Sequence, residues 1–377
     1  MTPRKTDGRR PPKSASDTNG AIAALLRDLA AVQTSKQSAW GYKRAAATVQ
    51  ALTEPIENFL LPDGSLRKIP NIGPSSSRVI LEVLKTGTSE TVARALESSP
   101  KRTAIVERRD AGGEHFLSGA QVAAALKNPR LRGPSLDDYR GDLQMHSVYS
   151  DGRQTLEAIV EAGLERGYEY CAVTDHSYGL QIAGGVSMAD LARQHAEIDR
   201  LNKRYRRGFR LLKGIEANIR PDGAVDMSPD ELSQLEIVVA APHSGLRSAL
   251  PQTSRMIAAV NTMGVHILGH PRGRKYGSRP GVAADWDKVF AAAAKMGVAI
   301  EIDGDPSRQD VDFELAKRAL AAGCIFALDS DAHSTHELAY AETAIAHARL
   351  AGLPTERIVN CWPLEQLLEW SALRRGR

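Results

Sequence analysis

The sequence predicts an α/β fold in which a small all-α domain precedes a seven-stranded, TIM-like (β/α)7 barrel. After Gly141, short apolar runs end in polar residues seven times, and helical stretches separate these runs. Strands that alternate with helices imply a parallel sheet. No dinucleotide-binding glycine pattern follows these runs, which favours a closed barrel over an open sheet. Before residue 100, apolar residues recur at helical spacing.

The front of the chain is predicted to be helical after a short arm. Residues 1–18, rich in Pro, Gly, Ser and basic residues, are expected to be disordered. Residues 20–98 are expected to form one domain, in which the segment Lys68–Pro74 is a tight turn between two helices. The predicted helices are Ala21–Val32, Tyr42–Leu52, Ser75–Leu84 and a short one within residues 88–98.

Residues 99–140 are expected to be a linker or a small subdomain. Thr103–Glu107 gives a weak strand signal, because β-branched residues are enriched in strands. A short helix is predicted at Gly119–Leu126, and Pro and Gly indicate a linker over Asn128–Ser135.

The barrel is expected to span residues 141–377, with its site at the carboxyl ends of the strands. The predicted strand ends lie near His146, Thr174–His176, Gly214–Glu216, Pro242–His243, Gly269–His270, Glu301–Asp303 and Ser330–His333. The predicted helices include Leu156–Arg166, Met188–Tyr205, Gln252–Met263, Trp286–Met296 and Phe313–Ala322.

Composition and charge limit the possible partners. No apolar run approaches the ~18 residues of a membrane span, so no membrane partner is expected. The three cysteines form no C-x-x-C pair, and a cytoplasmic location is expected. Residues 1–141 carry 22 Lys and Arg against 14 Asp and Glu, a balance of +8, whereas residues 142–377 carry −4. This asymmetry favours a polyanion-binding module joined to a cation-binding one.

Five of the ten histidines follow predicted strands, and acidic residues share their register. Converging carboxylates repel each other unless a cation neutralises them, and imidazole with carboxylate suits zinc, manganese or iron. A divalent metal centre is therefore predicted. Its candidate ligands are His146, Asp151, His176, Glu216, His243, His270, Asp331 and His333. By contrast, His195 and His347 lie in helical stretches and are expected to be exposed.

Residues 142–360 resemble the polymerase and histidinol phosphatase (PHP) family, especially the form fused to bacterial family X DNA polymerases. The resemblance implies a distorted seven-stranded barrel that holds two to three divalent ions per chain, Mn²⁺ or Zn²⁺, with Fe²⁺ as a further option. The matching motifs are Asp142–Ser147, Ser150–Gly152, Thr174–Ser177, Gly214–Glu216, Pro242–Ser244, Gly269–Pro271 and Ser330–Ser334.

The resemblance also implies roles for individual residues. One ion would take His146, Glu216 and Asp331, a second Glu216, His243 and His270, and a third Asp151, His176 and His333. Gln144 stands where the family has a histidine, so the first site is expected to be weaker. Arg274 and Arg308 match recurrent arginines and are expected to hold phosphate oxygens.

Residues 20–98 resemble the helix-hairpin-helix domain of family X polymerases through Gly41–Ala46 and the turn Ile69–Pro74. Such a turn offers backbone N–H groups to a DNA phosphate. The implied DNA-binding residues are Lys43, Arg44, Lys68, Ile72 and Gly73. The segment Ser75–Val83 contains no Lys for abasic-site lyase chemistry, and the ~40 residues after the domain are too few for a polymerase.

The expected function is metal-dependent phosphoester hydrolysis on DNA ends or oligonucleotides, as a 3′ exonuclease or 3′ phosphatase in DNA repair. One alternative is a small-molecule phosphate monoesterase that resembles histidinol phosphatase. Another is a DNA-binding protein whose metal barrel is inactive. The sequence does not indicate protein partners.

Overall fold

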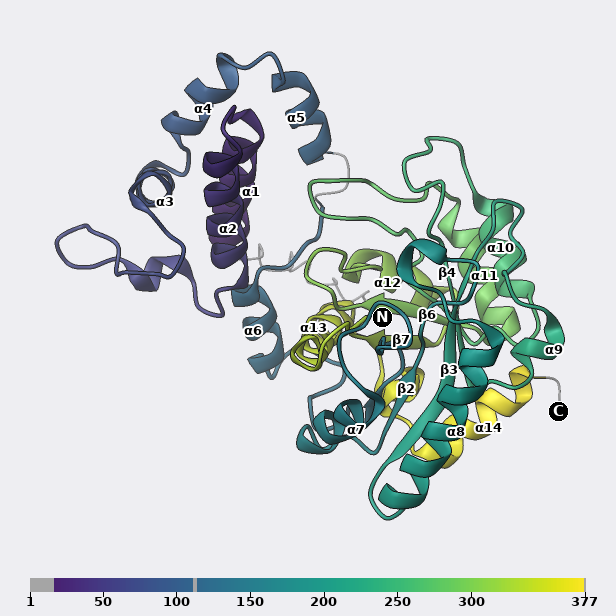
Figure 1. Cartoon of the computed structure of the whole chain (residues 1–377). Coiled ribbons are helices and arrows are strands. Elements are labelled where there is room, and N and C mark those ends of the chain that lie inside the picture. The colour runs from purple at the N-terminus through teal and green to yellow at the C-terminus, as the bar shows by residue number, and fades with distance from the viewer. Residues whose placement is uncertain (1–16, 111–113, 376–377) are drawn as a thin grey trace, which may run out of the picture.

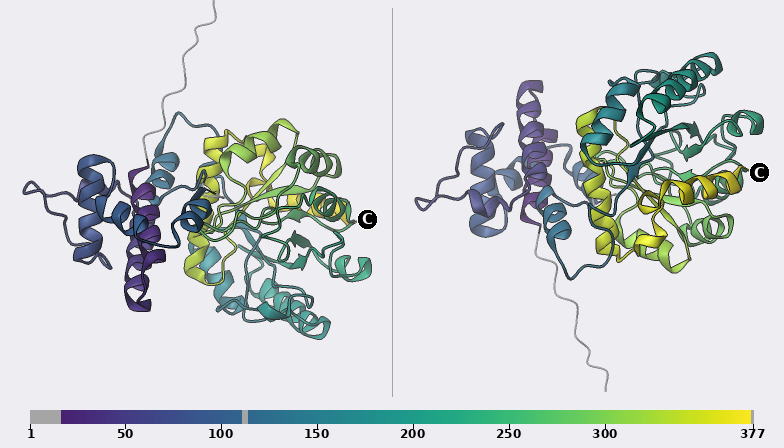
Figure 2. Two further views of the ribbon diagram at one scale, coloured as in Figure 1. Left: turned by 90° about the horizontal axis from the view of Figure 1, so that it is seen from above. Right: turned by 90° about the horizontal axis from the view of Figure 1, so that it is seen from below.

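The structure is a computed structural model that describes residues 17–110 and 114–375. Helices α1–α6 gather on one side of a barrel that begins at β1 (Figure 1, Figure 2). The predicted arm lies almost wholly outside the described residues, and Thr18 already belongs to the first helix.

The front domain confirms the helices predicted before residue 100. They are α1 Thr18–Val32, α2 Lys36–Ala51, α3 Pro74–Thr86 and α4 Glu90–Glu97. Side-chain caps begin three of them, because Asp17, Ser35 and Ser89 each accept a hydrogen bond from a backbone N–H of the first turn. A core that includes Ile22, Leu26, Val49, Ile80 and Val92 packs between the helices.

The weak strand signal near Thr103–Glu107 was wrong, because α5 covers Arg102–Asp110. Of residues 101–107 only Ile105 is buried, so the segment lacks the alternating pattern of a strand. A lone helix satisfies its own backbone hydrogen bonds, whereas a strand here would need a partner edge. The predicted helix after it is confirmed as α6, Gly119–Lys127, which a capping box of Ser118 and Gln121 begins.

Seven parallel strands form the barrel in chain order, each beside the next. They are β1 Gly141–Asp142, β2 Tyr170–Val173, β3 Arg210–Asn218, β4 Ile237–Ala241, β5 Ile267–Leu268, β6 Ala299–Asp303 and β7 Phe326–Asp329. A parallel bridge between Met145 and Ala332, just beyond β1 and β7, joins the first and last strands. The His146 N–H donates to the Ala332 carbonyl at 2.8 Å, so closure occurs beside the predicted metal ligands.

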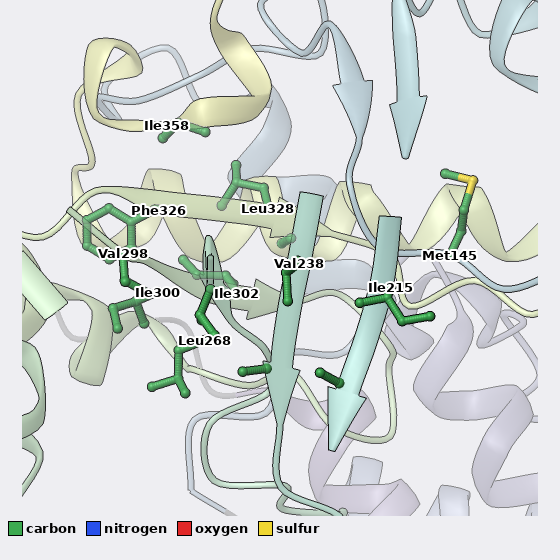
Figure 3. Close-up of a cluster of buried hydrophobic side chains, with 14 of the residues drawn as sticks. Met145, Ile215, Val238, Leu268, Val298, Ile300, Ile302, Phe326, Leu328 and Ile358 are labelled. Carbon is green, nitrogen blue, oxygen red and sulfur yellow. The ribbon is translucent and has the colours of Figure 1, made fainter. Parts of the chain in front are cut away.

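Helices cover the outside of the barrel and its amino end. They are α7 Leu156–Glu165, α8 Met188–Tyr205, α9 Pro229–Leu232, α10 Thr253–Asn261, α11 Trp286–Met296, α12 Phe313–Ala321, α13 Ala341–Ala351 and α14 Leu364–Arg374. Outward-facing strand residues such as Ile215, Val238 and Ile300 pack in the core drawn in Figure 3. Leu367 of α14 packs with residues at the starts of the strands. Among the described helices, none is both long and apolar enough to cross a membrane.

His347 on α13 is fully buried, so the prediction that it would be exposed was wrong, and His195 is half-buried. Helix α13 lies between the barrel and α6, so both of its faces are covered. His347 Nδ1 accepts from the Phe313 N–H at 3.1 Å, and Nε2 lies 2.8 Å from Gln309 Oε1. Buried His266 pairs in the same way with the Val238 N–H and the Ser371 carbonyl. One nitrogen of each ring must accept, so both rings are neutral.

Burial lowers the pKa of both His266 and His347 to about 3. Below pH 6.5 the unfolded chain therefore binds protons that the folded chain excludes, and stability falls as the pH falls. Lowering the pH from 7 to 5 should cost about 2 kcal/mol for each histidine. In His347→Gln, the loss between these pH values should be smaller by that amount in urea unfolding with chelator present. Substitution of the exposed His336 by Gln should preserve the wild-type loss, and an equal loss in His347→Gln would contradict the prediction.

Candidate metal centre

The eight predicted His, Asp and Glu ligands all converge at the carboxyl end of the barrel. Glu216 lies within β3, and the other seven follow β1, β2, β4, β5 and β7. Because parallel strands end at the same rim, residues far apart in sequence meet there. The structure places seven of these side chains, all but His270, in three overlapping groups, within each of which the donor atoms lie within 4.8 Å of one another. The groups are His146, Asp151, His176 and His333; His176, Glu216 and His243; and His146, Glu216 and Asp331.

Glu216 is at the centre of the site, and four imidazoles surround its fully buried carboxylate. Its Oε2 lies 3.0 Å from His176 Nδ1 and 3.4 Å from His146 Nε2. Its Oε1 lies 2.9 Å from His270 Nε2 and 3.3 Å from His243 Nε2. Burial acts to raise the pKa of Glu216, but the charges and hydrogen bonds of His176 and His243 hold this pKa well below its usual value. The carboxylate is therefore ionised and can bridge two cations.

Two further carboxylates lie on either side of His146. Asp331 Oδ1 is 3.0 Å from His146 Nε2, and the charge of Arg308 lowers the pKa of Asp331 despite its burial. Asp151 Oδ1 is 3.6 Å from His176 Nε2 and 3.4 Å from His333 Nε2. Burial acts to lower the pKa of His333, but the hydrogen bond to Asp151 and the nearby acids raise it to about 9.

The backbone is strained at two of these positions. His270 has φ of 23° and Asp331 has φ of 52°, in the left-handed region that residues other than glycine seldom adopt. Such a conformation costs about 1–3 kcal/mol and persists where the surroundings enforce it. Both residues follow a strand at the rim, so the strain aims their side chains at Glu216 and His146.

Hydrogen bonds from residues without a predicted role orient the predicted ligands. Asn218 Oδ1 lies 3.3 Å from His243 Nδ1, which leaves His243 Nε2 facing Glu216. The buried Asp175 accepts from the Ser147 N–H at 2.8 Å and from Gln194 Nε2 at 2.6 Å, which fixes the loop after His146. Asn218 has a signal in the sequence, since it follows Glu216 by two residues and alternation along a strand puts both on one face.

Gln144, predicted as a weak ligand, is fully buried with its amide against the carboxylate of Glu301. With its nitrogen toward Glu301, the amide donates to Oε2 at 3.2 Å. Glu301 also accepts from the His270 N–H, and burial together with the charges of Asp329 and Asp303 raises the pKa of Glu301 well above its usual value. Gln144 therefore supports the layer beneath His270, with only its amide oxygen left for a cation.

The structure separates the two predicted phosphate-binding arginines. Arg308 Nη1 lies 2.7 Å from Asp331 Oδ2, so this guanidinium borders the cluster. Arg274 is buried and donates to the carbonyls of Glu114, Arg308 and Gln309. Because this guanidinium already donates to three carbonyls, it cannot also bind phosphate. The predicted catalytic role of Arg274 therefore does not agree with its position. The burial of Arg274 prevents phosphate binding, and the sequence motif around Arg274 does not reveal that burial.

The predicted DNA-binding residues lie on the front domain. Gly73 precedes α3 and joins Arg44 in lining a shallow pocket of about 280 Å³. The guanidinium of Arg44 stacks 3.9 Å over the ring of Trp40, which is exposed. Lys43 and Lys68 are exposed outside this pocket, and Ile72 packs partly into the domain core.

Comparisons with known proteins agree with both parts of the chain. Residues 17–89 match the family model described as a helix-hairpin-helix domain. The chain is 35% identical over 235 residues to "DNA polymerase/3'-5' exonuclease PolX" of Bacillus subtilis, a match that covers 62% of this chain but only 41% of that relative. It is 31% identical over 237 residues to "Probable phosphatase YcdX" of Escherichia coli K12, covering 60% of this chain and 91% of the relative.

Among solved structures, histidinol phosphate phosphatase of Lactococcus lactis, complexed with zinc, L-histidinol and phosphate, is 17% identical, with a TM-score of 0.40 over 55% of this chain and 92% of that one. The match to the Escherichia coli phosphatase extends over nearly all of that relative. The similarity to the Escherichia coli phosphatase identifies the family, and the barrel of seven parallel strands with its rim of His, Asp and Glu agrees. The chain belongs to the PHP family of metal-dependent hydrolases that act on phosphate esters.

Proposed function

We propose that the chain hydrolyses phosphate esters at DNA ends or in oligonucleotides, as a 3′ exonuclease or 3′ phosphatase in DNA repair. The observation that carries the proposal is the presence, in one chain, of the Glu216-centred donor cluster and the helix-hairpin-helix domain. The Bacillus relative is named as a polymerase and 3′-5′ exonuclease, and the present chain matches only part of it.

The donors fit divalent transition metals. Among the described residues, the buried Nδ1 of His146 has no hydrogen-bond partner and lies 3.9 Å from Asp151 Oδ1, as expected of a nitrogen that faces a cation site. Glu216, His146 and Asp331 would hold one ion, and Glu216 would share a second with His243 and His270. Asp151, His176 and His333 would hold a third. Bound ions there would supply a Lewis acid for phosphate oxygens and a lowered pKa for a water molecule.

The protein's own groups would position the phosphate. Arg308 lies beside Asp331 and is 20% exposed at its side chain, so its guanidinium can reach an oxygen at the rim. The same guanidinium also lies 3.8 Å from Asp303 Oδ2 and 3.7 Å from Asp305 Oδ2, which fixes its position at the rim. A guanidinium beside the cluster would orient the ester and neutralise charge that develops on the leaving oxygen.

The name of the Escherichia coli relative favours a second candidate, a phosphatase for small phosphate monoesters. The front domain discriminates between the two candidates, because a phosphatase for small monoesters does not need a DNA-binding domain. Comparison of a chromogenic phosphate monoester with labelled single-stranded DNA, under manganese and zinc supplementation, separates the two functions.

Metal removal is the first prediction. Purified protein should carry about two to three transition-metal ions per chain, and chelation should abolish hydrolysis. His243→Ala should lower turnover by more than about 100-fold, because even residues that support metal ligands contribute about 10–100-fold. Metal analysis and the DNA assay test this together. Turnover should be normal in His195→Ala, whose half-buried ring lies on α8 outside the cluster, and less than half an equivalent of metal would contradict the prediction.

DNA anchoring by the front domain is the second prediction. A Cβ at Gly73 would meet nothing within 4 Å, so Gly73→Val should fold normally yet block close approach of the backbone to a phosphate. Binding to single-stranded DNA should weaken by about tenfold, the loss of one charge-assisted contact. The salt slope should become shallower from about −3, since each phosphate contact contributes roughly −0.7 to −0.9.

The measurement is a binding titration at several salt concentrations, with turnover of a small chromogenic phosphodiester as a check on the barrel. Gly208→Val provides the matched control, because Gly208 lies before β3 at the opposite end of the barrel and its added Cβ would only touch Leu164 at 4.0 Å. Unchanged affinity and slope in Gly73→Val would remove the anchor and favour the small-molecule phosphatase.

A further inference from the structure

A short hairpin beside the predicted metal-ligand cluster carries one arginine, Arg279, that the proposed chemistry does not use. In the loop between β5 and α11, Lys275 and Arg279 pair across an antiparallel bridge. Gly273, just before the hairpin, donates its N–H to the His270 carbonyl at 2.7 Å. The hairpin therefore begins five residues after a candidate metal ligand, and the residue Gly273 before it is fixed against that ligand's backbone.

Neighbouring loops hold the hairpin on both sides. The Tyr276 N–H donates to the carbonyl of Ser307, the residue before Arg308, at 2.8 Å. On the other side, Arg247 Nη1 donates to the Ser278 carbonyl at 2.8 Å. A Cβ on Gly273 would lie 2.7 Å from Leu246 Cδ2, so the hairpin base packs directly against the loop that follows His243. Arg279 consequently stands between the loop of Arg247 and the loop of Arg308.

The three guanidiniums of Arg247, Arg279 and Arg308 are unequally neutralised. Arg308 pairs with Asp331, but within the described ranges neither Arg247 nor Arg279 has a carboxylate at ion-pair distance. Arg279 is half-buried, and its Nε donates to the Gly273 carbonyl at 2.7 Å, which leaves both terminal nitrogens without a partner among the residues that the structure describes. Burial and then the positive charges of Arg308 and Arg247 lower the pKa of Arg279.

Among the described residues, no acid forms an ion pair with Arg279. The charge of Asp310 acts on Arg279, but its carboxylate already accepts from Arg272 Nε at 2.8 Å and from the Arg272 and Gly273 N–H groups. Arg279 thus lies beside other positive charges without an ion-pair partner of its own among the described residues, which is unfavourable. An anion that visits the rim would remove that cost, and planar guanidiniums suit phosphate oxygens.

We infer that Arg279 and Arg247 form a subsite for a second phosphate of the substrate, next to the phosphate that is cleaved. The ligand chemistry is a phosphodiester one nucleotide away from the cleaved bond in the same strand. This inference rests on the proposed function and deepens it, since a small monoester has a single phosphate and would leave the subsite empty. Arg308 faces the cleaved phosphate, and Arg279 and Arg247 extend the positive track away from Asp331.

The test compares kcat/KM for the trinucleotide TpTpT, with two phosphates, and the dinucleotide TpT, with one, in manganese-supplemented full-length protein. Wild type should prefer the trinucleotide. Arg279→Gln should lower the trinucleotide-to-dinucleotide ratio by about tenfold through KM, as expected for loss of one charge-assisted hydrogen bond. Arg247→Gln should lower it in the same direction. Arg279→Lys, which keeps the charge without the planar fork, should recover part of the ratio.

A neutral methylphosphonate at the linkage that is not cut provides an independent readout. It should lower the ratio in wild type and cause no further loss in Arg279→Gln, because the variant has already lost the contact. Arg207→Gln, an exposed arginine before β3 at the other end of the barrel, should retain the wild-type ratio. Ratios unchanged in both Arg279→Gln and Arg247→Gln, or a methylphosphonate as good as the diester, would overturn the subsite.

Failure of the proposed function gives a different pattern. If the protein hydrolyses p-nitrophenyl phosphate but neither oligonucleotide, DNA-end cleavage is excluded. The subsite is then tested by competitive inhibition of monoester hydrolysis. Tighter inhibition by TpTpT than by TpT that disappears in Arg279→Gln supports it, and equal inhibition by the two oligonucleotides in wild type overturns it.

Discussion

The burial of one ionised carboxylate, Glu216, governs the chemistry at the mouth of the barrel. Taking such a charge out of water costs several kcal/mol unless nearby groups compensate. Four imidazoles provide that compensation, and they come from four different strand ends. Barrel closure therefore has an electrostatic consequence, because any slip between strands would leave Glu216 buried without its partners. The strained backbone at His270 and Asp331 agrees with this, since only a strongly constrained rim maintains two such conformations.

The segment between the domains forms hydrogen bonds with the barrel loop that carries Arg308. Gln309 accepts from the Leu117 N–H at 2.7 Å and donates to the Leu117 carbonyl at 2.9 Å. Arg274 donates to the Glu114 carbonyl and to the carbonyls of Arg308 and Gln309. The chain that leaves the front domain is thus tied to the loop that presents Arg308. If the front domain binds DNA as proposed, the segment that joins the two domains would also support the loop that carries Arg308.

Sequence patterns predicted the elements whose signal is local. The alternation of strands and helices, the short helix at Gly119–Leu126 and the polar residues at strand exits each depend on neighbours within a few positions. The strand signal near Thr103–Glu107 was wrong because only Ile105 is buried there, and burial depends on distant helices. His347 was misjudged for a similar reason. An amphipathic helix usually has one face exposed to solvent, but α13 lies between the barrel and α6, so His347 is buried.

The sequence by itself determined which residues reach the barrel mouth, because the side-chain types and their place after each strand follow from chain order alone. Only the tertiary structure decided what each polar group does there. Arg274 and Arg308 have similar sequence signals, yet one is held by three backbone carbonyls and the other faces Asp331. Gln144 occupies a ligand position in the motif, but its amide pairs with Glu301 from β6. A hydrogen bond or ion pair acts over about 3 Å, and the partners that come within that distance belong to segments far apart in the chain.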